Sequence, residues 1–117
     1  MTAETATELR ISSRRRLPNR RGHELIDFEH GGIRYTAGIG RFEDGELAEI
    51  FLNTAKHGTA IDTNARDAAV AASLLLQYGC PMHTLQRALT RNGDGSASGP
   101  LARALDLLAA SPADQDA

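Results

Sequence analysis

The sequence has only one cysteine, Cys80, among its 117 residues, and this scarcity excludes several classes of protein. A single cysteine forms no intrachain disulfide, and chains without disulfides are typical of the cytoplasm, so we predict a cytoplasmic protein. Cys80 and His83 have the spacing of half a zinc site, but no second cysteine is present to complete it. We therefore predict no metal site and no cofactor.

Long apolar runs are missing as well. The most apolar stretch, residues 68–76, has nine residues, whereas a helix that spans a bilayer needs about 20. The N-terminal residues lack the apolar segment of a secretory signal. Hydrophobic residues make up 41% and charged residues 24%, which is ordinary for a globular protein. We predict one domain with a modest core and no membrane partner.

The charges are distributed unevenly along the chain. Residues 1–21 contain six arginines against two glutamates, whereas residues 22–117 contain seven basic and thirteen acidic groups. We predict a flexible basic arm over residues 1–16, which could neutralise the phosphates of a nucleic acid. The arm could instead be solvated, or lie on its own acidic body or on a partner subunit. The arginines that would contact nucleic acid are Arg14, Arg15, Arg16, Arg20 and Arg21.

Three strands are predicted over residues 23–30, 33–42 and 47–53, where apolar and polar residues alternate. The pairs Gly31-Gly32 and Asp44-Gly45 predict tight turns between them. In the third strand, alternation directs Ala48, Ile50 and Leu52 to one face and Leu47 and Phe51 to the other. The carboxylates of this region are typical of a solvated surface, so we assign no catalytic residue.

Helical spacing replaces alternation after residue 58. Thr59, followed three residues later by Asp62, predicts the start of a long helix, and Gly79 predicts its end. Pro81 and Pro100 each predict the first position of a further helix. The prediction is an α+β fold, a three-stranded antiparallel meander followed by two or three helices packed on one face. This single domain covers residues 17–111, and residues 112–117 form a frayed tail.

Two motifs within this pattern resemble a known family. The third strand ends in an Asn-x-x-Lys-x-Gly corner (Asn53, Lys56, Gly58), and the long helix ends in Tyr-Gly-x-Pro (residues 78–81). With the order of the elements, these motifs are similar to the TSCPD domain family. That family includes the C-terminal domain of vitamin B12-dependent (class II) ribonucleotide reductases and small stand-alone proteins, of which this chain resembles one. The resemblance covers about residues 17–110.

The resemblance implies an accessory domain without the enzyme. The Thr-Ser-Cys-Pro-Asp signature itself is absent, and NGDGSASG occupies the stretch after the second helix. The family's reductase reaction needs a radical cysteine, a redox cysteine pair and a large barrel, which one cysteine in this chain cannot supply. We therefore expect a non-catalytic module that binds a protein partner or a nucleotide-like anion. The alternative is a nucleic-acid-associated protein that uses the arginine arm.

The corner between the third strand and the long helix is the predicted anion site. Lys56 could hold a phosphate as a point charge, and backbone N–H groups around Gly58 and Thr59 could add to it. Asn53 completes this candidate set. The other interpretation is a well-made turn, in which the polar side chains satisfy the turn's own backbone and Lys56 is solvated.

Self-association is predicted by the third strand. Leu47 and Phe51 would leave an apolar patch on a face that the helices do not cover, and monomers seldom expose such a patch. A second copy related by two-fold symmetry is the simplest cover, so we predict a homodimer with the sheet in its interface.

Overall fold

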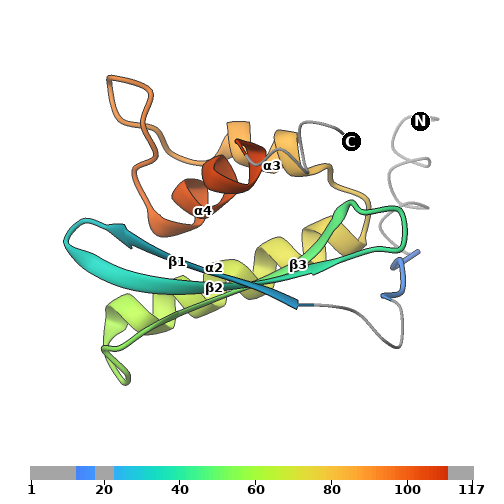
Figure 1. Cartoon of the computed structure of the whole chain (residues 1–117). Helices are drawn as coiled ribbons and strands as arrows, with labels where there is room; N and C mark the ends of the chain where they lie inside the picture. Colours follow the sequence, from blue (N-terminus) through green and yellow to red (C-terminus); the bar gives the residue numbers. More distant parts are fainter. Residues whose placement is uncertain (1–12, 18–22, 111–117) are drawn as a thin grey trace.

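The structure, a computed structural model, describes residues 13–17 and 23–110. Its element order is β1 (His23–His30), β2 (Ile33–Arg41), β3 (Leu47–Thr54), α2 (Ala60–Gln77), α3 (Met82–Ala88) and α4 (Pro100–Ala109), shown in Figure 1. The predicted α+β fold is confirmed. Most of the predicted arm, with Arg20 and Arg21, and the predicted tail lie outside the described residues.

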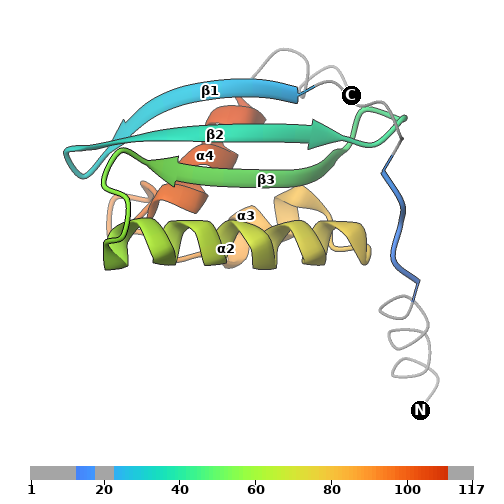
Figure 2. The same ribbon diagram turned by 90° about the horizontal axis from the view of Figure 1, so that it is seen from below.

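The three strands form an antiparallel sheet in the order β1-β2-β3. Alternate residues of each strand face the core, where the rings of Phe28 and Tyr35 stack with their centroids 5.5 Å apart. The side chains between them occupy the opposite face, called here the open face. Figure 2 views the sheet from this face, with α4 behind the strands and α2 beside β3. The helical layer contributes Leu101, Ala104, Leu105 and Leu108 of α4 to the core.

One prediction for β3 is wrong. Leu47, expected on the open face with Phe51, is buried in the core. The pairing with β2 shifts here, because Gly40 pairs with Glu49 while Arg41 pairs with Leu47. Ala48 is therefore the extra residue of a β-bulge, which bends the strand and re-aims the side chain before it. Phe51 does lie on the open face, with 43% of its surface exposed.

Helix α2 runs along the outer edge of β3 and supplies polar side chains to that strand's backbone. The Ser73 Oγ accepts a hydrogen bond from the Ile50 N–H at 2.9 Å and donates one to the Ile50 carbonyl at 3.0 Å. Gln77 Nε2 donates to the Ala48 carbonyl. Buried alanines such as Ala69 allow this close approach. The edge of β3 is thus closed by a helix rather than by a strand.

The helix boundaries follow their sequence signals with one exception. Thr59 is the N-cap of α2, and its Oγ1 accepts from the Asp62 N–H, as predicted. At the other end, Gly79 has a φ of 106°, and the Cys80 N–H returns to the Leu75 carbonyl at 2.9 Å, as in a Schellman motif. Pro81, expected at the first helical position, is instead the N-cap of α3, with an extended ψ of 150°.

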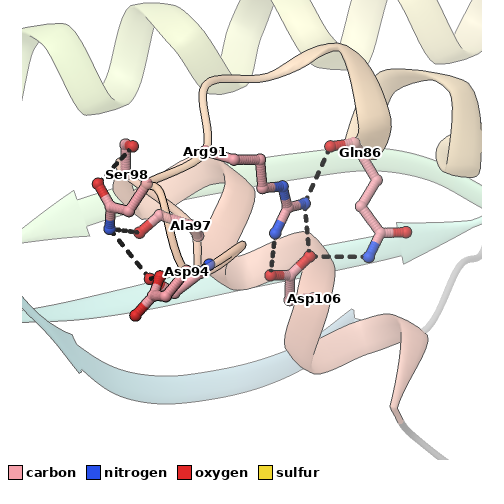
Figure 3. Close-up of polar contacts among 8 residues, drawn as sticks. Gln86, Arg91, Asp94, Ala97, Ser98 and Asp106 are labelled. Carbon is pink, nitrogen blue, oxygen red and sulfur yellow. Dashed lines mark hydrogen bonds and ion pairs between the residues drawn. The ribbon is translucent and has the colours of Figure 1, made fainter.

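The connection from α3 to α4 is fixed by an ion-pair network (Figure 3). Both terminal nitrogens of Arg91 donate to the carboxylate of Asp106 on α4. The side-chain amide of Gln86 on α3 donates to the same carboxylate, and the backbone carbonyl of Gln86 accepts from Arg91. The hydrogen bond from Arg91 holds the pKa of Asp106 below its ordinary value. One partly buried carboxylate therefore joins α3, the connection and α4.

We expect Asp106→Ala to lower Tm by roughly 5 °C, because it removes a bidentate ion pair and leaves Arg91 unpaired. Hydrogen exchange of residues 90–98 should accelerate in the same variant. Asp67→Ala is the matched control, since Asp67 is exposed on α2 and makes no hydrogen bond or ion pair in the described structure. Equal Tm losses in the two variants would show that the network does not fix the connection.

Candidate anion-binding site

The corner between β3 and α2 uses most of its polar groups on itself. Thr54 Oγ1 accepts from the Lys56 N–H at 3.0 Å. The Lys56 carbonyl accepts from Thr59 Oγ1 at 2.6 Å and from the Thr59 N–H at 3.4 Å. Gly58 reaches a φ of 78°, which a side chain would disfavour, and so permits the turn. These contacts match the interpretation of residues 54–59 as a well-made turn.

A buried carboxylate lies beneath this turn. Asp62, with 4% of its surface exposed, accepts from the Thr54 N–H at 3.0 Å and from Arg66 Nε at 2.8 Å. These two hydrogen bonds hold the pKa of Asp62 below its ordinary value, and the bond from Thr54 has the larger effect. His57 Nδ1 lies 3.9 Å from the same carboxylate. The first turn of α2 therefore already contains a negative charge of the chain's own, which competes with any anion at the helix N-terminus.

A depression of about 620 Å³ lies beside the corner, and basic and amide side chains converge on it. β2 supplies Arg34 and Thr36, β3 supplies Asn53, the turn supplies His57, and α2 supplies Arg66. Arg34 is exposed and has no hydrogen bond or ion pair within the described residues. Arg66 is half exposed, and its bond to Asp62 fixes its orientation.

One carboxylate also lines the depression. Asp27 on β1 accepts a hydrogen bond of 2.7 Å from Thr36 Oγ1. Asp27, Thr36 and Asn53 are direct cross-strand neighbours, so they form one polar row over the open face. The depression thus offers an unpaired arginine at one place and hydrogen-bond acceptors at another.

The predicted site residues are brought together only in part. Asn53 lines the depression, whereas Lys56, Gly58 and Thr59 form the adjoining turn and do not line it. Three further lining residues, Arg34, His57 and Arg66, were not predicted from the sequence. Alternation along β2 placed Arg34 beside Thr36 on one face, and the spacing of Asp62 and Arg66 is that of a helical ion pair. Neither signal indicates that the two arginines approach one depression.

Two of the three arm arginines that the structure describes, Arg14 and Arg15, contact the domain at the far end of α2 (Figure 1). Arg14 Nε donates to Gln77 Oε1 at 2.7 Å. Arg15 pairs with Asp44 at 2.7 Å and with Glu46 at 3.3 Å, and its guanidinium lies 3.9 Å from the centroid of the Phe42 ring. The bond to Asp44 raises the pKa of Arg15. These two arginines therefore already have partners within the chain, which matches the interpretation that the arm lies on its own body.

The remaining sequence candidates add no site. The thiol of Cys80 donates weakly to the Pro81 carbonyl at 3.7 Å. Within residues 13–17 and 23–110, no three His, Cys, Asp or Glu side chains are placed to hold a metal ion. None of the helices in these ranges is both long and apolar enough to cross a membrane.

Comparison with known proteins identifies relatives for two thirds of the chain. A vitamin B12-dependent ribonucleotide reductase of Agrobacterium fabrum is 38% identical over 77 residues, which are 66% of this chain and 6% of the relative. The enzyme of the same name from Bradyrhizobium diazoefficiens is 35% identical over 80 residues, or 68% of this chain and 6% of the relative. No family model matches the chain, and no solved structure matches it.

The chain therefore spans about 6% of the length of the relatives it matches. The resemblance to vitamin B12-dependent ribonucleotide reductases that the sequence predicted is confirmed, while the name TSCPD and a C-terminal position in the large enzymes stay predictions. The chain is a ribonucleotide reductase-like domain, homologous to a short segment of the vitamin B12-dependent enzymes.

Proposed function

We propose that the chain is a non-catalytic binding module whose ligand is a phosphate-bearing nucleotide, held in the depression beside β2, β3 and α2. The observation that carries this proposal is Arg34, an exposed arginine without a partner in the described structure, on a depression that Asn53, His57 and Arg66 also line. A guanidinium presents five donors in a planar fork, which matches the oxygens of a phosphate.

The class of ligand follows from the relatives and from the polar row. The relatives are named for reducing ribonucleotides, so a ribonucleotide is the phosphate-bearing molecule that such a module would meet. Arg34 and Arg66 supply positive charge for its phosphates. Asp27 supplies an acceptor to which a ribose hydroxyl could donate, as carboxylates do in other nucleotide sites. The single cysteine supports a binding role rather than turnover.

The test is a titration of the purified chain with ADP, followed by calorimetry, with adenosine as the ligand that lacks phosphate. We expect ADP to bind and adenosine to bind at least tenfold more weakly. Arg34→Ala should weaken ADP binding about tenfold, because a charge-assisted hydrogen bond is lost. Arg87→Ala is the matched control, since Arg87 is exposed in the last turn of α3 and should leave the affinity unchanged.

Lys56→Ala separates the depression from the corner that the sequence predicted. If Lys56→Ala weakens binding and Arg34→Ala does not, the anion binds at the turn and our placement is wrong. If ADP fails to bind at millimolar concentration, the nucleotide proposal fails, and a protein partner becomes the expected ligand. Nucleic acid binding by the arm stays a prediction, to which the partners of Arg14 and Arg15 lend no support.

A further inference from the structure

The two edges of the sheet differ in how they are covered. Three side chains of α2 make hydrogen bonds to the outward backbone groups of β3; they belong to Asp62, Ser73 and Gln77. The outer edge of β1 receives no hydrogen bond from any residue in the described part of the chain. β1 contains no proline, no lysine and no bulge, so its backbone can pair along its whole length, and its only charged side chains are three carboxylates.

The groups on this free edge can be assigned from the ladder. Ile50 bonds to Ser73 through both its N–H and its carbonyl, so these groups point away from β2. Ile39 pairs with Ile50, so the backbone N–H and carbonyl of Ile39 must point toward β1, where the paired residue is Glu24. Since the direction alternates along a strand, the outward backbone groups of β1 belong to His23, Leu25, Asp27 and Glu29.

The same alternation places an apolar row across the open face. Leu25, Gly38 and Phe51 are direct cross-strand neighbours. A side chain at position 38 would contact both Leu25 and Phe51. Because residue 38 is glycine, the surface between these two side chains is formed by backbone. Leu25 is 75% exposed, the largest exposed fraction among the large hydrophobic residues of the described chain. The row ends at the free edge with its most exposed member.

We propose that β1 pairs antiparallel with β1 of a second copy of this chain, about a two-fold axis at Leu25. The result is a continuous six-stranded sheet. In this register the two copies of Leu25 face each other, and the apolar row runs unbroken from Phe51 of one copy to Phe51 of the other. The pairing occupies the outward N–H and carbonyl groups of His23, Leu25 and Asp27 in both copies.

The charges on β1 select this register. With the axis at Leu25, His23 of each copy lies opposite Asp27 of the other, and both lie on the open face. An axis at Asp27 would place two aspartates directly opposite each other, which is destabilising. An axis at Ile26 would place Leu25 opposite Asp27 and break the apolar row. On the open face, only the axis at Leu25 joins apolar to apolar and acid to histidine, while on the other face it places Glu24 opposite Ile26.

Cross-linking tests the interface and its register together. In a Cys80→Ser background, Leu25→Cys should form a disulfide-linked dimer, because a hydrogen-bonded pair has Cα atoms about 5.5 Å apart, within the range of a disulfide. Glu29→Cys is the matched control on the same edge, because it leaves His23, Leu25 and Asp27 unchanged. Its two copies would lie about 27 Å apart, the length of eight residues along a strand, and should not cross-link. Cross-linking of Glu29→Cys as efficient as that of Leu25→Cys would overturn the register.

A mass measurement by light scattering tests the interface without a new thiol. The unmodified chain should have the mass of a dimer, and Leu25→Pro should be a folded monomer, because proline removes only an outward N–H and spares the ladder to β2. Leu25→Val should stay dimeric. A monomeric unmodified chain at its highest soluble concentration would end the proposal. So would a dimer that survives Leu25→Pro but is lost in Phe51→Lys, since that result indicates packing through the open face instead.

Discussion

Replacing Ser73 by alanine should lower the free energy of unfolding by about 2–4 kcal/mol, although the side chain loses a single oxygen. Ser73 has 7% of its surface exposed, and its hydroxyl serves both the N–H and the carbonyl of Ile50. Ile50 itself has no exposed surface. The variant therefore leaves two buried backbone groups without partners, and each costs about 1–3 kcal/mol when it cannot reach water.

Urea denaturation of Ser73→Ala measures this effect, and Thr63→Ala on the same helix is its control. Thr63 is exposed, and its hydroxyl makes no hydrogen bond among the described residues, so its loss should change stability by less than about 0.5 kcal/mol. Serine and threonine differ in helix propensity by only a few tenths of a kcal/mol, so propensity does not explain a difference of about 2 kcal/mol or more between the two variants. If Ser73→Ala destabilises no more than Thr63→Ala, the helix does not close the edge of β3 as described.

The strands and turns were predictable from the sequence because their signals are local. Alternation of apolar and polar residues fixes which side chains share a face, and glycine pairs mark where the chain reverses. The start of α2 at Thr59 and its end at Gly79 were predictable for the same reason, since capping depends on residues within a few positions. These signals determine the order of the elements and the identity of most core residues.

The place of α2 was not predictable in the same way. Its alanines indicate close approach, but periodicity does not distinguish packing on a sheet face from packing along a sheet edge. The polar side chains of Ser73 and Gln77 lie on the buried side of the helix, and this was the available signal for an edge. A buried serine in a helix needs a partner, and the backbone of a free strand edge offers one. Leu47 was misplaced because a bulge breaks the alternation on which the prediction depended.

The candidate site depends on this same arrangement of α2. Only a helix beside the edge of β3 can bring Arg66 next to Asn53 of β3 and Arg34 of β2. A helix on the core face would direct its polar residues away from the open face. The arginines converge because of tertiary packing, so their meeting could not be derived from spacing in the sequence. The corner motif pointed to the right region because Asp62 and Thr59 start the helix there.

Asp62 connects the fold to the site, and its replacement by alanine should lower Tm by roughly 5–15 °C. The loss removes the acceptor of the Thr54 N–H and releases Arg66 from its fixed orientation. Asp62→Asn should be milder, because an amide oxygen can still accept from Thr54 while the amide nitrogen cannot pair with Arg66. Asp67→Asn, an exposed change on the same helix, is the control and should leave Tm within about 2 °C.

The pH dependence of this effect separates the charge of Asp62 from its shape. Because folding lowers the pKa of Asp62, the carboxylate stabilises the folded state above the pKa of the unfolded chain, about 3.9, and loses this contribution as the pH falls through the folded value. The Tm difference between the unmodified chain and Asp62→Asn should therefore be full at pH 7 and shrink below about pH 4. Asp44, Asp94 and Asp106, whose pKa values are also lowered, keep their acid response in both proteins, so the difference isolates Asp62. A difference that stays constant from pH 7 to pH 3 would mean that Asp62 acts through packing and neutral hydrogen bonds. The negative charge beneath the corner would then have no part in holding Arg66 at the depression.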